Sequence, residues 1–223
     1  MATNLKPNEV PIAYSMIAAA KRVRPRRDGQ HPYQEYFYLW TAFNNIYSVL
    51  SERDGTRTKL KRNDDGSVAT YANGHMKIPE VVEVAERDQL QAAERAFDDE
   101  LRHTLVLHES TQHFVNRIPY WQGQKIEFDA IGQRLNGVIN VSCTIDRQYP
   151  VWSPVDVLFY EEYLDNPADE TIRIFLVQQI IELLHTVRKN LMHSSKKFDD
   201  SNDISVVKHA LPLLELILRY FTG

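Results

Sequence analysis

The chain has 223 residues, of which 43% are hydrophobic and 25% charged, so it has the composition of an ordinary globular protein with enough length to bury a core. Its net charge of -4 argues against a protein that coats long nucleic acid nonspecifically, although it allows local binding of a few phosphates. The single cysteine, Cys143, excludes an intrachain disulfide and a cysteine-based zinc site.

The first predicted element is a helix over residues 11–24, which Pro25 ends because proline cannot continue a helix. Basic residues gather at its end: Lys21, Arg22, Arg24, Arg26 and Arg27. Such residues complement the negative end of a helix dipole, which is the favoured interpretation. Contact with phosphates is the alternative.

An aromatic helix is predicted over residues 33–52. Its apolar side chains recur at three- and four-residue spacing, which is typical of a buried helix face. They are Phe37, Trp40, Phe43, Ile46, Tyr47 and Leu50, widened by Tyr36 and Leu39. We therefore expect this helix to be central to the core.

The middle of the chain is less regular. The turn signal at residues 63–66, between short alternating runs, predicts a surface hairpin or loop within residues 51–74. Residues 79–117 are expected to form one or two helices with a charged outer face. Residues 119–149 are the hardest to assign, and the apolar run 138–145 is expected to be a strand or a loop packed on the core.

The last third predicts three helices. Ser153 and Pro154 supply an N-cap and a first helical residue for a helix to about Leu164. Residues 166–170 repeat that start signal and open a long helix, and after the polar break 194–202 a final helix runs over residues 203–221, with a bend or irregular turn at Pro212. The fold class is therefore all-α: a helical bundle with a central loop-rich insertion that includes a short hairpin.

Three histidines invite a metal-site interpretation. His103, His108 and His113 lie five residues apart, which is about 140° of rotation per step, so one helix face cannot present all three. The sequence has neither a glycine-rich phosphate loop nor a GxSxG nucleophile motif. No metal or cofactor is expected.

The end of the long helix carries Arg188 and, after four intervening residues, His193. An arginine holds a phosphate and its developing charge, while a histidine moves a proton near neutral pH, so the two suit phosphodiester cleavage. The alternative is that both residues only complete a helix end, where basic side chains meet free carbonyl groups.

An arginine, four to six intervening residues and a histidine near the end of a helix are the motif of the HEPN superfamily. Residues 34–52 and 168–221, which contain the aromatic helix and the two C-terminal helices, resemble this superfamily. The resemblance implies one helical domain over residues 1–223, with residues 53–150 as an insertion specific to this branch. It also implies a metal-independent endoribonuclease of toxin–antitoxin or defence systems, with two subunits meeting at the motif helices. A cytoplasmic location is expected because residues 1–11 are polar and lack the apolar core of a secretory signal.

The resemblance assigns catalysis to Arg188 and His193. Arg188 is expected to bind the scissile phosphate, and His193 to serve as general base on the ribose 2'-OH or general acid on the 5'-oxygen. Substrate-binding residues are expected around them: Lys189, Asn190, Lys196, Lys197 and Asn44. The expected partners are RNA, a second copy of the chain and an antitoxin or defence protein, with no membrane. The alternative is a catalytically silent module that binds RNA, a nucleotide or a protein, which Lys189 favours because a small polar residue often follows the motif arginine.

Overall fold

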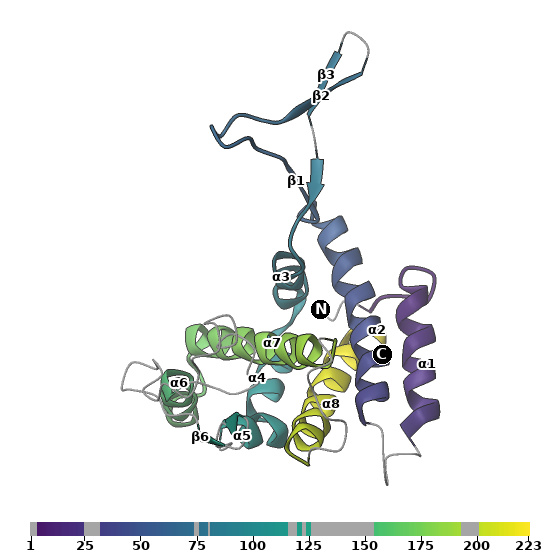
Figure 1. The fold of residues 1–223 in the computed structure, drawn as a ribbon. Helices are drawn as coiled ribbons and strands as arrows, with labels where there is room; N and C mark the ends of the chain where they lie inside the picture. The colour runs from purple at the N-terminus through teal and green to yellow at the C-terminus, as the bar shows by residue number, and fades with distance from the viewer. Residues whose placement is uncertain are drawn as a thin grey trace.

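The computed structural model describes residues 4–24, 32–73, 76–79, 81–115, 120–121, 124–125, 154–192 and 201–223. Within these residues the chain is predominantly helical, as the sequence predicts, and it contains eight helices and three two-stranded antiparallel sheets. A helical body carries a projecting β-arm (Figure 1). None of the described helices is long and apolar enough to cross a lipid bilayer.

The two N-terminal helices lie side by side (Figure 1). Helix α1 (Pro11–Val23) begins with a proline, which suits the first turn of a helix, and α2 (Pro32–Arg53) carries the predicted aromatic face. Trp40, Phe43 and Tyr47 are buried as expected. Phe37 was expected on the same face, and this is wrong, because its side chain is 49% exposed.

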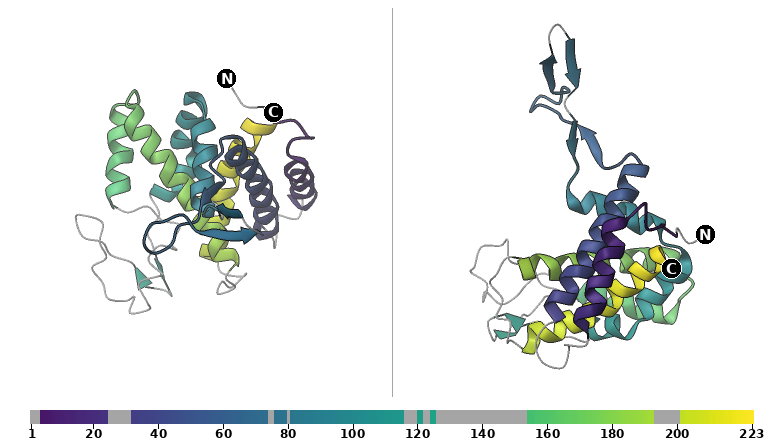
Figure 2. Two further views of the ribbon diagram at one scale, coloured as in Figure 1. Left: turned by 90° about the horizontal axis from the view of Figure 1, so that it is seen from above. Right: turned by 90° about the vertical axis from the view of Figure 1, so that its right-hand side faces the viewer.

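The β-arm follows α2 and extends away from the helices (Figure 2). Strand β1 (Thr58–Leu60) pairs with β4 (Val81–Glu83), and β2 (Thr70–Asn73) pairs with β3 (Met76–Pro79) further out. The predicted turn at residues 63–66 lies between β1 and β2. There Gly66 has a φ of 82°, and an isolated bridge joins Arg62 to Val68.

Three helices follow the arm: α3 (Glu86–Ala96), α4 (Asp99–Leu107) and α5 (Glu109–Val115). The helical path is interrupted between α3 and α4, because Asp98 caps α4: its side chain accepts the backbone N–H of Leu101. The helical path is interrupted a second time between α4 and α5, at His108, whose Nδ1 accepts the backbone N–H of Ser110. Residues 53–150, expected as one insertion, therefore contain both an exposed arm and helices that join the core.

These helices place apolar side chains in the core, where they pack with α2, α7 and α8. Among these side chains are Leu90, Phe97, Leu105 and Phe114. Strands β5 (Tyr120–Trp121) and β6 (Gln124–Lys125) form a minimal hairpin after α5. The predicted strand or loop at residues 138–145 lies outside the described residues.

The C-terminal helices are α6 (Pro154–Asp165), α7 (Glu170–Met192) and α8 (Ser201–Thr222), in agreement with the periodicity. Asp169 begins α7, since its side chain accepts the backbone N–H of Ile172. Helix α8 continues through Pro212. The segment before α1 is tied to the end of α8, because the backbone N–H of Leu5 donates to the carbonyl of Phe221 at 2.7 Å. Tyr14 Oη lies 2.9 Å from the carbonyl oxygen of Leu5 and 3.0 Å from that of Thr222, so its single hydrogen can be donated to either.

We expect Leu214→Ala to lower the free energy of unfolding by about 2–5 kcal/mol, since it leaves a cavity in a fully buried part of α8. Urea unfolding followed by circular dichroism measures the change. The control is Leu158→Ala on α6, where the leucine is 59% exposed and the change is expected to stay within about 0.5 kcal/mol. Equal effects of the two substitutions would contradict the assignment of this core.

Candidate functional site

Arg188 lies near the C-terminal end of α7 and makes an ion pair with another helix. Its Nη1 donates to Oε2 of Glu86, the first residue of α3, at 3.1 Å. The two side chains are 29% and 28% exposed. The helix dipole favours a carboxylate in the first turn of a helix, so the ionised form of Glu86 is stabilised at the start of α3. Arg188 thus makes a tertiary contact, which a residue that only completes its own helix would lack.

Glu86 is the centre of a cluster formed by α2, α3 and α7. Tyr47 Oη donates to Glu86 Oε1 at 2.6 Å, and His185 Nε2 lies 3.4 Å from Oε2. The hydrogen bond with His185 lowers the pKa of Glu86 to about 2, assisted by Tyr47 and the charge of Arg188, although burial opposes the shift. Glu86 is therefore an anion at physiological pH, and it holds Arg188 in one orientation.

Two tyrosines of α2 complete the framework around this cluster. Burial raises the pKa of Tyr47, and its bond with Glu86 raises it further, so the phenol remains a donor. Burial also raises the pKa of Tyr36 well above its usual value. Tyr36 Oη donates to the carbonyl of Leu184 at 2.6 Å, which fixes α7 against α2 beside the cluster.

His185 is a member of the cluster that the sequence reasoning missed. Its ring stacks on Trp40, with centroids 5.9 Å apart and planes 22° apart. His185 Nδ1 and Trp40 Nε1 are both buried without a hydrogen-bond partner among the described residues. The spacing of three residues from His185 to Arg188 puts both on one face of α7, which is a signal the sequence does contain. Glu86 has no comparable signal, because nothing local indicates that α3 packs there.

The structure brings together only some of the predicted site residues. Lys189 and Asn190 follow Arg188 on α7 and are partly exposed. Asn44 is partly buried and lies on the face of α2 that carries Trp40 and Tyr47, by its spacing of four and three residues from them. No hydrogen bond joins Asn44 to Arg188 among the described residues.

Three predicted site residues cannot be placed. His193, Lys196 and Lys197 lie outside the described residues, since the described part of α7 ends at Met192. The pairing of Arg188 with His193 therefore stays a prediction from the sequence.

The three histidines considered for a metal have different surroundings. His103 Nδ1 lies 2.6 Å from Tyr163 Oη, His108 binds the first turn of α5, and His113 stacks on His209 with ring centroids 3.5 Å apart. Burial lowers the pKa of His108 and of His209. The described part of the chain holds no group of three or more side chains that could bind a metal ion.

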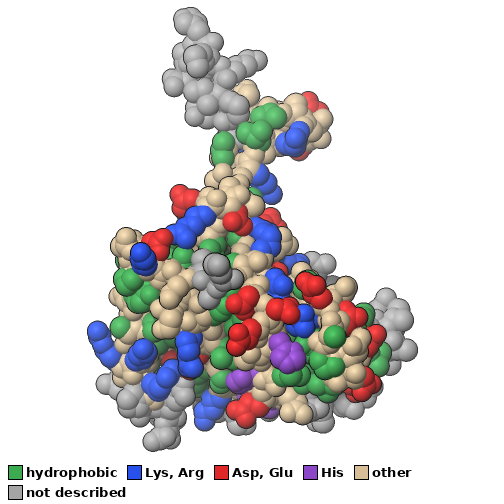
Figure 3. All heavy atoms as spheres, turned by 180° about the vertical axis from the view of Figure 1, so that it is seen from behind, with side chains coloured by type: hydrophobic (Ala, Val, Ile, Leu, Met, Phe, Trp, Pro, Cys, Tyr) green, Lys and Arg blue, Asp and Glu red, His purple; other side chains and the backbone are tan. Residues whose placement is uncertain are grey.

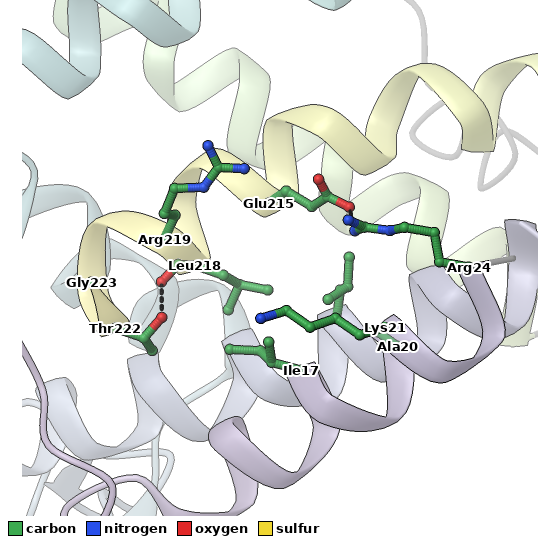
Figure 4. Close-up of a pocket in the computed structure, with 10 residues that line it drawn as sticks. Ile17, Ala20, Lys21, Arg24, Glu215, Leu218, Arg219, Thr222 and Gly223 are labelled. Carbon is green, nitrogen blue, oxygen red and sulfur yellow. Dashed lines mark hydrogen bonds and ion pairs between the residues drawn. The ribbon is translucent and has the colours of Figure 1, made fainter.

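A second candidate site is the groove between α1 and α8 (Figure 4), with a volume of about 250 Å³. Its apolar lining includes Ile17, Leu39 and Leu218, and its basic residues are Lys21, Arg24 and Arg219. Arg24 Nε donates to the buried Glu35 at 2.9 Å, and Arg24 also pairs with Glu215 across the groove. At Arg24, therefore, the basic end of α1 has a structural role in neutralising carboxylates.

On one face of the molecule the charges of the described residues are mixed rather than of one sign (Figure 3). On the face drawn in Figure 3, basic side chains gather along one lower edge, and acidic ones lie among them and over the centre. Among the described residues of this face, mixed charge of this kind gives no long electrostatic track for a duplex, and it is compatible with contact to a few phosphates.

Comparison with protein-family models, with curated proteins and with solved structures found no match to this chain. The site is therefore interpreted from its own geometry and chemistry. The cluster of Tyr47, Glu86, His185 and Arg188 is the stronger candidate, because it joins three helices and fixes a partly exposed cation.

We expect Glu86→Gln to lower the free energy of unfolding by about 1–2 kcal/mol at pH 7, since water screens part of the lost charge interaction. The pKa of Glu86 is lower in the folded state than its ordinary value of 4.5. Its contribution is therefore complete above pH 4.5 and is lost as the pH falls toward about 2. The difference between the two proteins should shrink over that range.

Chemical denaturation of both proteins between pH 7 and pH 3 tests this expectation. The control is Glu161→Gln at an exposed position of α6, which should change stability by less than about 0.5 kcal/mol throughout. A Glu86→Gln difference that stays constant as the pH falls would contradict the assigned ionic role.

Proposed function

We propose that this chain is a metal-independent endoribonuclease of the HEPN type, acting in the cytoplasm through Arg188 and His193 at a dimer cleft. The observation that carries the proposal is the fixed, partly exposed guanidinium of Arg188, held by Glu86 one turn before the end of the described part of α7. A cation held in advance stabilises developing negative charge without reorganising during the reaction.

Arg188 suits the binding of a phosphate group. A guanidinium has five N–H donors on three nitrogens, and the bond to Glu86 engages Nη1. The other nitrogens can bind two phosphate oxygens in the bidentate geometry that arginine favours. Glu86, Tyr47 and His185 act as positioning residues in this scheme, because they set the direction of the guanidinium.

The reaction is an attack of the ribose 2'-oxygen on the adjacent phosphorus. One His193 accepts the proton of the 2'-OH, the bond from phosphorus to the 5'-oxygen breaks, and a second His193 gives that oxygen a proton. The products are a 2',3'-cyclic phosphate and a free 5'-OH. A homodimer supplies both histidines, which one chain lacks.

The remaining predicted residues would bind the RNA around the reacting phosphate. Lys196 and Lys197 follow His193 closely and would contact neighbouring phosphates, while Asn190 and Asn44 would bind sugar or phosphate oxygens. Lys189 adds a further positive charge. An antitoxin or defence-system protein would be the regulatory partner of such an enzyme.

A second candidate function is a catalytically silent module that binds RNA, a nucleotide or a protein. Glu86 favours it, because an ionised carboxylate 3.1 Å from Arg188 Nη1 competes with a phosphate for the same cation. The position of Lys189 directly after Arg188 favours it as well.

We expect purified protein to cut single-stranded RNA in the presence of EDTA and to leave 2',3'-cyclic phosphate ends. Arg188→Ala and His193→Ala should each lower the cleavage rate by about 100-fold or more, since each removes a group that acts in the transition state. Labelled RNA, resolved on denaturing gels, measures the rate. The matched control is Arg95→Ala, an exposed arginine of α3 outside both candidate sites, which should cut at the wild-type rate.

Arg188→Lys separates a catalytic role of Arg188 from a structural one. It preserves the positive charge opposite Glu86 but loses the bidentate geometry, so it should remain folded by circular dichroism and still cut slowly. If Arg188→Ala and His193→Ala both cut as fast as wild type, the catalytic assignment is wrong.

For the silent module we expect the opposite pattern: RNA binding without cleavage. Binding should then be unchanged by His193→Ala, and the combined Lys196→Ala and Lys197→Ala change should weaken it because phosphate contacts are lost. Fluorescence anisotropy at two salt concentrations measures it. Cleavage that depends on His193 would contradict this second candidate.

A further inference from the structure

The groove between α1 and α8 combines an apolar lining with basic side chains (Figure 4). Three helices supply the apolar part of the lining: α1 with Ile17 and Ala20, α2 with Leu39, and α8 with Leu218. The volume of about 250 Å³ is near the lower limit for ligand pockets, so the groove suits a small molecule. Binding there would remove the apolar part of such a molecule from water.

An ion-pair network holds the two walls of the groove together at one end. Arg24 of α1 pairs with Glu215 of α8, and Arg24 Nε donates to Glu35 of α2 at 2.9 Å. Glu35 is only 1% exposed, and a buried carboxylate is costly without a cation beside it, so Arg24 is held in this position. The groove is therefore formed before a ligand arrives, which lowers the entropic cost of binding.

Lys21 and Arg219 are the basic residues of the lining whose charges remain available. Neither side chain makes a hydrogen bond or an ion pair within the part of the chain that the structure describes. Figure 4 shows Lys21 extending from α1 into the groove, toward α8, while Arg219 belongs to the α8 wall. Two cations, one from each wall, favour a negatively charged group between them.

The charges of the lining favour a carboxylate as that group. Glu215 also lines the groove, so a doubly charged phosphate meets more repulsion there than a singly charged carboxylate. The planar fork of an arginine matches a carboxylate, and a lysine adds a compact positive charge. The apolar lining suits a short hydrocarbon as the remainder of the ligand.

We propose that the groove between α1 and α8 binds a small amphipathic carboxylate, of the class of medium-chain fatty acids. Its hydrocarbon part lies against Ile17, Leu39 and Leu218, and its carboxylate pairs with Lys21 and Arg219. Among the described residues, the lining contains none of those assigned to RNA cleavage, so this inference goes beyond the proposed function and does not depend on it.

Isothermal titration calorimetry with octanoate tests the proposal, and octanol serves as the neutral analogue. We expect octanoate to bind one site per chain with a dissociation constant of about 0.1 mM or below. Octanol should bind about 10-fold more weakly, because it lacks the charge. Lys21→Gln and Arg219→Gln should each weaken octanoate binding by about 5-fold or more. The matched control is Arg22→Gln, at an exposed neighbour on α1 outside the lining, which should bind octanoate like wild type.

The proposal is overturned if wild type does not bind octanoate, or if neither Lys21→Gln nor Arg219→Gln weakens the binding. Octanol bound as tightly as octanoate would overturn it too, because the cations would then contribute nothing. Octyl phosphate, which is doubly charged at pH 8, should bind more weakly than octanoate, and the reverse order would refute the choice of a carboxylate. Both variants should remain folded by circular dichroism. Lys21→Gln should leave the rate of RNA cleavage unchanged, so failure of the groove and failure of the ribonuclease are observed separately.

Discussion

The burial of helix α2 is the constraint on which the helical body depends. Four other helices, α1, α3, α7 and α8, contact it, and its largest aromatic side chains are almost inaccessible to water. A helix that is apolar on so much of its surface has no stable place until its neighbours have packed around it. The same helix carries the donors of Tyr36 and Tyr47, so the packing that forms the core also determines the position of α7 and of Glu86.

Glu86 joins the packed helices into the candidate site. Its carboxylate has Tyr47, His185 and Arg188 within hydrogen-bonding range, and these three come from two helices that are far apart in the sequence. A partly buried anion with such partners is stable only if they stay in place, and the arginine is fixed in return. The same contact is the reason that two functions are proposed, because a carboxylate that orients a cation also competes with a phosphate for it.

The β-arm differs from the helical body in how much of its surface is buried. It buries little of its own surface, and its short strands expose apolar and charged side chains on the same face. In the body, many polar groups are fixed by partners within the chain. On the arm, Leu60 and Val81 are exposed to solvent.

Local sequence signals determined most helices and one turn, because spacing of apolar residues, prolines and capping residues act within a few positions. They predicted α1, α2, α6, α7 and α8 and the turn that contains Gly66. They did not separate α3, α4 and α5, since the capping contacts at Asp98 and His108 are single hydrogen bonds within a continuous helical pattern. Arg188 was recognised as a candidate from its motif, and its partner was not. Glu86 is 102 residues away from it, and only the packing of α3 against α2 and α7 decided that a carboxylate would meet that arginine.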